Sequence, residues 1–190
     1  MTSTESEALL HTPGHVKHDG HNLTGFIIFL CSESIIFFAF FVGYGVLKVT
    51  APTWYPDGVT GIAVREPLIN TVILVSSSFV IYFAERYLHK KNYWGFRIVW
   101  LITMLMGSYF VYGQYVEWSE LTFSLSSGVF GGLFYLLTGF HGLHVITGIL
   151  LMGLMLYRSF IPGNYDKGEM GVESISLFWH FVDVIWIILF

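Results

Sequence analysis

Long apolar stretches alternate with short polar ones along the 190-residue chain. A helix that crosses a bilayer needs about 20 mostly apolar residues, and five stretches approach or exceed that length. The pattern therefore predicts an all-α, polytopic membrane protein that folds as a bundle of five transmembrane helices. The predicted helices are residues 23–47, 67–88, 97–116, 128–157 and 174–190.

The amino end differs from the rest of the chain because residues 1–22 contain no apolar run of comparable length. We predict a flexible cytoplasmic tail over residues 1–22, followed by one transmembrane domain over residues 23–190. The tail has four histidines, which could bind a metal ion or gather protons at the membrane surface. A flexible tail whose histidines have no role is the simpler interpretation. These histidines are His11, His15, His18 and His21.

Composition narrows the classes of function. Hydrophobic residues make up 54% of the chain and charged residues 12%, whereas a soluble domain has roughly 25% charged residues. The net charge of -4 argues against a nucleic-acid partner. The single cysteine, Cys31, excludes an internal disulfide and a metal site built from several thiolates.

Basic residues are distributed unevenly between the predicted loops. Cytoplasmic loops of membrane proteins carry an excess of lysine and arginine. This asymmetry predicts a cytoplasmic amino terminus and a carboxyl terminus outside. The residues on the predicted inner side are Lys17, Arg86, Lys90, Lys91, Arg97, Arg158 and Lys167, against Lys48 and Arg65 on the outer side.

Five ionisable side chains fall well inside the predicted helices, away from their ends, where lipid disfavours them. A charged residue near the bilayer centre costs about 2.5–3.5 kcal/mol on insertion scales, so such groups normally face the bundle interior and have partners. They are candidates for a functional or structural site. The five are Glu33, His141, His144, His180 and Asp183.

Three interpretations of these residues compete. The histidines could ligate a haem or, together with Glu33 or Asp183, a non-haem metal ion. They could form a path for protons or ions. Alternatively, they hydrogen-bond between helices and fix the packing, which the glycines around His141 and His144 favour, because glycine lets neighbouring helices approach closely. These glycines are Gly131, Gly132, Gly139, Gly142, Gly148 and Gly153.

Several segments resemble signature sequences of subunit III of the haem-copper terminal oxidases, in that family's order. They are "GFIIFLCSESIIFFAFF", "EPLINTVILVSSS", "YGQYVEWSELTFSLSSGVFG", "TGFHGLHVITG" and "LFWHFVDVIWI". The resemblance covers about residues 23–190. The long form of this subunit has seven helices, and this chain is similar to the short bacterial form of five, in which the first two are lacking.

The resemblance implies a role within a larger enzyme. The chain would be a core subunit of a proton-pumping cytochrome c oxidase or quinol oxidase that reduces O2 to water. It would hold no haem, copper or other metal itself, because these cofactors belong to partner subunits. Its partners would be the catalytic subunit I, other oxidase subunits and membrane lipid, including bound phospholipid. The expected location is the bacterial inner membrane, with a thylakoid membrane as a second candidate.

The resemblance also implies roles for individual residues. Glu33 matches the family's buried carboxylate, which influences proton uptake and the stability of the active site, while Arg158 and Glu173 would contact lipid at the inner face. The intramembrane residues His141, His144, His180 and Asp183 would be structural. Two alternatives remain from the residues alone. One is an independent membrane metalloprotein using His141, His144, His180 and Glu33, and the other is a small proton-coupled transporter using Glu33 and Asp183.

Overall fold

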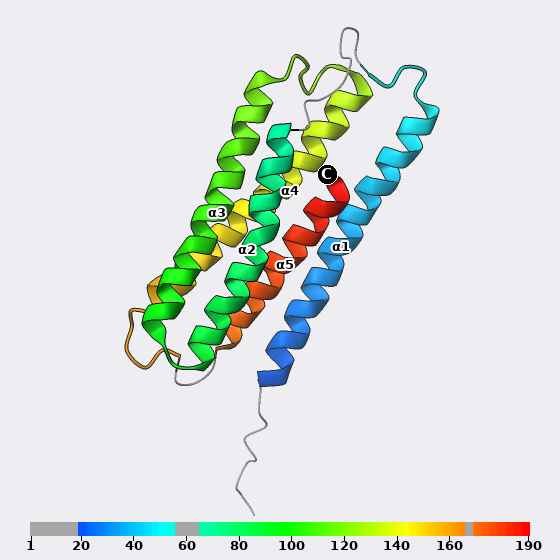
Figure 1. Ribbon diagram of the computed structural model, residues 1–190. Coiled ribbons are helices and arrows are strands. Elements are labelled where there is room, and N and C mark those ends of the chain that lie inside the picture. Colours follow the sequence, from blue (N-terminus) through cyan, green and yellow to red (C-terminus); the bar gives the residue numbers. More distant parts are fainter. Residues whose placement is uncertain (1–18, 56–64, 166–168) are drawn as a thin grey trace, which may run out of the picture.

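The computed structural model describes residues 19–55, 65–165 and 169–190, and these ranges form a bundle of five long helices (Figure 1). All five are long and apolar enough to cross a membrane, which confirms the predicted all-α polytopic class. The predicted tail lies mostly outside the described residues. The helices are α1 (Asp19–Thr50), α2 (Arg65–His89), α3 (Tyr93–Glu120), α4 (Gly128–Arg158) and α5 (Met170–Leu189).

Local chemistry explains where the helices begin and end. Pro67 lies in the first turn of α2, where its missing N–H leaves no hydrogen bond unmade. The side chain of Asn92 caps α3 by accepting a hydrogen bond from the Gly95 N–H at 3.0 Å. The chain turns sharply before that cap, with Lys91 in the left-handed region at a φ of 56°. The connection between α2 and α3 is therefore a tight turn, and the two helices pack along their lengths.

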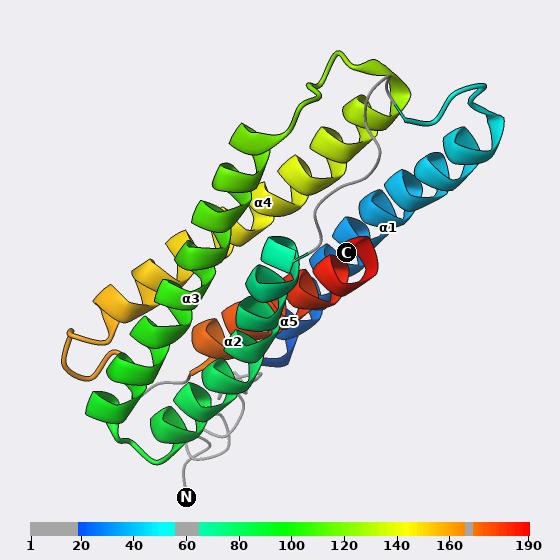
Figure 2. The same cartoon turned by 45° about the horizontal axis from the view of Figure 1, so that its top comes forward.

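Four of the helices form the body of the bundle. Helix α2 packs on α3 and α5, and α4 packs on the same two helices, whereas α1 contacts, among the helices that the structure describes, only α4 and α5. Figures 1 and 2 show α1 along the side of the bundle away from α3. The centre is filled by large side chains that are fully buried. They include Trp100, Trp179, Phe96, Phe110, Leu74, Ile81 and Met152.

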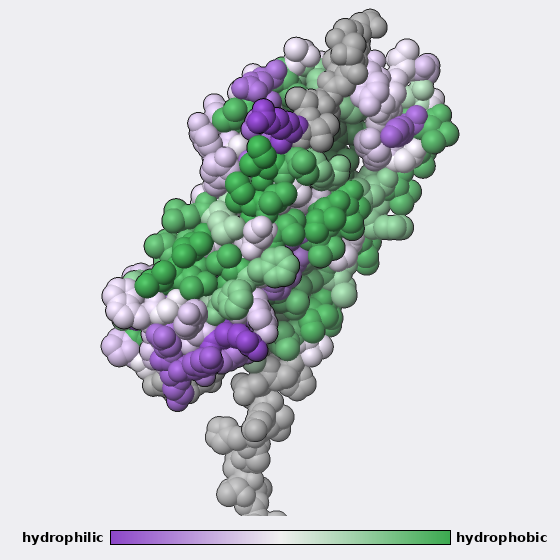
Figure 3. Space-filling view, in the orientation of Figure 1, coloured by the Kyte–Doolittle hydropathy of each residue, from purple (hydrophilic) through white to green (hydrophobic). Residues whose placement is uncertain are grey.

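The surface matches a protein that spans a membrane. Apolar residues form a broad band across the middle of the molecule in Figure 3, and hydrophilic residues gather at its two ends. Helix α1 contributes strongly to the apolar surface: Ile28 is 64% exposed, Ile35 68% and Phe38 67%. Lipid or other protein chains must cover these side chains, because a monomer in water rarely exposes so large an apolar area.

Two glycines make room for a single tryptophan at the centre of the bundle. A Cβ at Gly107 of α3 would lie 2.5 Å from the ring of Trp179, and a Cβ at Gly148 of α4 would lie 2.9 Å from it. Of the glycines predicted to let helices approach, Gly148 faces α5, and Gly139 and Gly153 face Trp118 and Met104 of α3; all three meet side chains and not a backbone. A Cβ at Gly142 would meet nothing within 4 Å. The close approach expected of these glycines is therefore not made at Gly142 by the described residues.

Hydroxyl groups on the lipid-facing surface bond to their own helices. Ser34, Ser108 and Thr147 are exposed, and the hydroxyl of each donates to the carbonyl oxygen four residues earlier at 2.8 Å. Ser32 donates in the same way to the carbonyl oxygen of Phe29 at 2.7 Å. None of these donors requires a partner from outside its own helix.

Candidate functional site: ionisable pairs between the helices

Glu33 of α1 and His144 of α4 meet near the middle of the bundle. The carboxylate Oε2 lies 3.1 Å from the imidazole Nε2. The side chains are 17% and 11% exposed, so the pair is largely withdrawn from its surroundings. No basic partner for Glu33 at its depth is evident from the sequence, yet the structure provides one on another helix.

Hydrogen bonding determines how many protons the pair holds. His144 Nδ1 lies 2.8 Å from the carbonyl oxygen of Phe140, which can only accept, so Nδ1 carries a hydrogen. A hydrogen bond between Nε2 and Glu33 then requires one further proton between the two groups. That proton lies either on the carboxyl group of Glu33 or on Nε2 of a charged imidazolium. In both cases the pair has no net charge, which suits an apolar environment.

Aromatic rings enclose the imidazole of His144. The rings of Phe37 and Phe140 lie 5.1 Å and 4.8 Å from it, centroid to centroid, and the ring of Phe178 is stacked at 6.2 Å. Glu33 reaches this position because it shares one face of α1 with Leu30 and Phe37, the buried residues of that helix. Spacings of three and four residues place all three on that face. The remaining surface of α1 is largely exposed.

His180 and Asp183 of α5 share a partner on α2, the hydroxyl of Ser78. Ser78 donates to Oδ2 of Asp183, and His180 Nδ1 lies 3.0 Å from the same hydroxyl oxygen. A serine has a single hydrogen to donate, so His180 Nδ1 must donate to Ser78. The result is a directed chain from His180 through Ser78 to Asp183. Asp183 is buried, and its Oδ1 has no hydrogen-bond partner within the described ranges.

Two tryptophans extend this contact along the same pair of helices. The indole N–H of Trp179 donates to the Ser77 hydroxyl at 2.8 Å, and that of Trp186 donates to the Thr71 hydroxyl at 2.9 Å. The segments "EPLINTVILVSSS" and "LFWHFVDVIWI" therefore bind each other. The prediction from the sequence did not include the hydroxyl residues of α2, whose only signal was a run of three serines within an apolar helix. We refer to these contacts together as the α2–α5 interface.

His141 has different surroundings from His144. Its side chain is fully buried, with the ring of Trp186 at 4.8 Å and that of Phe110 edge-on at 5.9 Å. Neither ring nitrogen has a hydrogen-bond partner in the part of the chain that the structure describes. His141 thus lies between α3 and α5, whereas His144 lies between α1 and α5, and the two do not join Glu33 and His180 in a common set of metal ligands.

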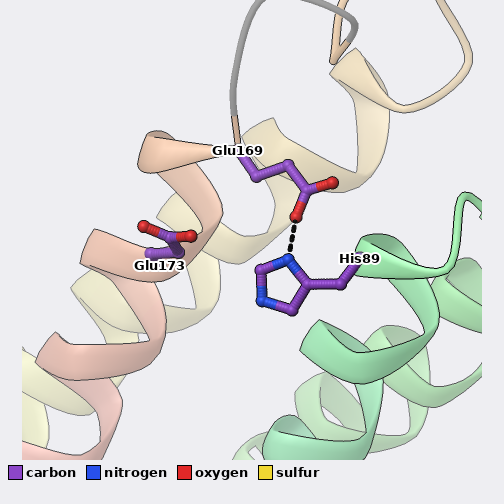
Figure 4. Close-up of side chains that lie close together, drawn as sticks. All are labelled: His89, Glu169 and Glu173. Carbon is purple, nitrogen blue, oxygen red and sulfur yellow. Dashed lines mark ion pairs between the residues drawn. The ribbon is translucent and has the colours of Figure 1, made fainter. Parts of the chain in front are cut away.

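The predicted lipid-contact residues both lie at the end of the bundle where α4 leads to α5. Arg158 Nη2 lies 3.4 Å from Oδ1 of Asn164, whose amide in turn donates to the Arg158 carbonyl oxygen at 3.3 Å. The hydroxyl of Tyr165 donates to the carbonyl oxygen of Met155 at 2.7 Å, and burial raises the pKa of Tyr165. Glu173 instead faces α2, where it lies near His89 and Glu169 (Figure 4).

Known proteins are similar in sequence to this chain over almost its full length. The family described as Cytochrome c oxidase subunit III matches residues 4–190. The chain is 40% identical over 185 residues to cytochrome c oxidase subunit 3 of Synechocystis sp., covering 95% of this chain and 79% of that protein. It is 43% identical over 175 residues to the same subunit of Thermostichus vulcanus, covering 92% and 87%. The chain belongs to the cytochrome c oxidase subunit III family.

Membership in the subunit III family confirms the predicted function in outline. The chain is a non-catalytic core subunit of a haem-copper oxidase, a translocase complex built with other subunits, and it is a multi-pass membrane protein. The family typically lacks redox centres. The likeness extends to the subunit of Rattus norvegicus, with 37% identity over 173 residues, covering 87% of this chain and 66% of that protein.

Proposed function

We propose that this chain stabilises the catalytic subunit of its oxidase and assists proton uptake, while haem and copper reside in partner subunits. The oxidase would reduce O2 to water with electrons from cytochrome c, as the name of the family indicates. The observation that carries the proposal is the Glu33–His144 pair, because two ionisable groups share one proton inside the membrane.

The hydrogen bonding of the pair supports a role in proton handling. The shared proton moves between Glu33 and His144 without creating net charge, so its transfer has a low electrostatic cost in an apolar environment. A second proton would convert the pair into a neutral acid beside an imidazolium, and loss of the first would leave a lone carboxylate. The pair thus has three protonation states. One member of the pair belongs to α1, which is the least buried of the five described helices.

The surface of α1 supports the scaffolding role. Its exposed side chains form an apolar face along the helix, including Ile28, Ile35 and Phe38. Within the described chain α1 packs only on α4 and α5, so most of its circumference is available to another chain or to lipid. We propose that the catalytic subunit covers part of this face.

The proposed orientation follows from the basic residues, with the amino end in the cytoplasm and the carboxyl end outside. The α2–α3 turn would then be cytoplasmic, and the protein would lie in the bacterial inner membrane or in a thylakoid membrane. Arg158 at the inner end would contact phospholipid phosphates, with Glu173 beside the headgroups. Reporter fusions test the orientation: a fusion near residue 91 should be active inside, and one near residue 122 outside. Activity outside at residue 91 would reverse the assignment.

The substitution Glu33→Gln tests the role in proton uptake. Glutamine can still donate to His144 Nε2, so the variant should assemble and begin turnover near the parent rate, because the metals lie in other subunits. If the pair supplies protons, the rate should then fall or the enzyme should inactivate earlier than the parent at alkaline pH, where protons are scarce. The measurement is oxygen consumption over many turnovers at several pH values.

Glu66→Gln is the matched control, because this carboxyl is exposed in the first turn of α2. It should behave like the parent at every pH. Parent-like behaviour of Glu33→Gln throughout would leave Glu33 with a purely structural role. An assembled variant that is inactive from its first turnover would show that the catalytic centre had been placed in the wrong subunit.

A further inference from the structure

Three metal-ligating side chains converge at the end of the bundle where α2 finishes and α5 starts. His89 is the last residue of α2, Glu169 is the N-cap residue of α5, and Glu173 lies in the first turn of α5. The imidazole Nδ1 of His89 lies 2.6 Å from Oε2 of Glu169. One ligand atom from each of the three residues lies within 4.8 Å of the other two (Figure 4).

The packing of the first turn of α5 against the end of α2 brings these groups together. Glu169 and Glu173 are four residues apart, so they share one face of α5. The contacts of the α2–α5 interface hold that face against the end of α2. Glu85, one turn before His89, interacts electrostatically with both His89 and Glu173. Three carboxyl groups therefore lie near a single imidazole.

We propose that His89, Glu169 and Glu173 bind a divalent metal ion that links the ends of α2 and α5. One imidazole nitrogen with two carboxylate oxygens matches the ligands of Zn2+, which binds nitrogen and oxygen donors at about 2.0–2.2 Å. Purely oxygen-ligated ions such as Mg2+ and Ca2+ fit less well, since the histidine would contribute little to them. A water molecule or Glu85 completes four-coordination.

Binding requires only a small adjustment of the side chains. Two ligands of one tetrahedral Zn2+ lie roughly 3.3 Å apart at those bond lengths, so His89 and Glu169 must separate slightly. The side chain of His89 is 54% exposed and can rotate. The ion replaces the proton between the imidazole and the carboxylate, and that proton passes to solvent. Zn2+ replaces a single proton, so the net charge of the site rises by one unit, and the nearby carboxyl groups offset this added positive charge.

Direct measurement of Zn2+ binding to the assembled oxidase tests the proposal. All proteins carry alanine at His11, His15, His18 and His21, so that the amino-terminal histidines cannot contribute. After treatment with a chelator, binding of radioactive Zn2+ is titrated in this background and after adding His89→Ala or Glu173→Gln. We expect the background to bind one more equivalent than His89→Ala. Glu173→Gln should weaken that site by more than the roughly 10–100-fold typical of losing an outer-shell partner.

Glu120→Gln is the control, since this exposed carboxyl lies at the other end of the bundle, and it should leave the stoichiometry and affinity unchanged. Retention of the chain in each complex is measured alongside, so that a loss of folding is not mistaken for a loss of ligands. Equal Zn2+ binding by the background protein and by His89→Ala overturns the proposal. So does a background protein whose bound Zn2+ is fully accounted for by the other subunits of the oxidase. Neither result bears on the role of Glu33.

Discussion

The α2–α5 interface and the α1–α4 contact both place ionisable side chains inside the membrane, but they do so differently. Across the α2–α5 interface, two indoles, one imidazole and one carboxyl group bond to hydroxyls of α2, and the tryptophans are fully buried or nearly so. Between α1 and α4, a single acid meets a single base, and phenylalanine rings of the two helices pack beside them. The first arrangement suits a fixed structure, whereas the second suits a group that gains and loses protons.

Removing the largest side chain of the α2–α5 interface should have the largest effect. Trp179 is fully buried against Gly107 and Gly148, so Trp179→Ala leaves a cavity that neither neighbour can fill. We expect a loss of about 3–5 kcal/mol in stability, measured as a lower midpoint of thermal unfolding in detergent. Trp94, 69% exposed, is the matched control. If both substitutions lowered the midpoint equally, the interface would not be what holds the bundle together.

Adding one methyl group distinguishes the two sides of α4. Gly148→Ala places a Cβ against the ring of Trp179, with Phe178 also within 3.4 Å, and overpacking of this kind costs about 1–3 kcal/mol. Gly142→Ala meets open space and should be neutral or slightly stabilising, because alanine favours a helix more than glycine does. Thermal unfolding of the two variants checks this. Destabilisation by Gly142→Ala would indicate that another chain packs closely at that position.

The smallest effect is expected from a single hydrogen bond of the α2–α5 interface. Asp183→Ala removes the acceptor of the Ser78 hydroxyl, and such bonds across membrane helices contribute about 0.6 kcal/mol on average. The chain should therefore leave the complex somewhat more readily as detergent increases, without complete loss. Asp183→Asn keeps an oxygen that accepts from Ser78 and should be retained better. Equal retention of the alanine variant and the parent would remove Asp183 from the list of stabilising contacts.

Hydropathy predicts the helices well because each span must be apolar over a fixed length, but it locates their ends poorly. The fifth helix was predicted from residue 174 and begins at Met170, and the first was predicted from residue 23 and begins at Asp19. The added turns contain charged or polar residues, Glu169 and Glu173 around the start of α5 among them. Such residues carry no hydropathy signal, although acidic groups at a helix amino end favour helix formation.

The partners of the buried groups could not be predicted from the sequence. Glu33 and His144 are each unusual because they are ionisable within an apolar segment. Periodicity along one helix does not show, however, which other helix a side chain faces. Ser78 gives no signal beyond its place in a run of three serines, because a serine in a membrane helix usually bonds to its own backbone. His89 falls just outside the predicted helix of residues 67–88. Only the packing of α2 against α5 shows that it lies beside Glu169.

The hydroxyl groups that bond back to their own helices affect how readily this chain enters a bilayer. A hydropathy scale counts Ser34, Ser108 and Thr147 as polar, but each donor is already satisfied four residues earlier. The cost of transferring such a group from water to lipid is mainly that of an unmade hydrogen bond, so here most of it does not arise. The mean hydropathy of +0.65 therefore understates the free energy that favours insertion, because it counts these two serines and one threonine as polar although their donors are already bonded.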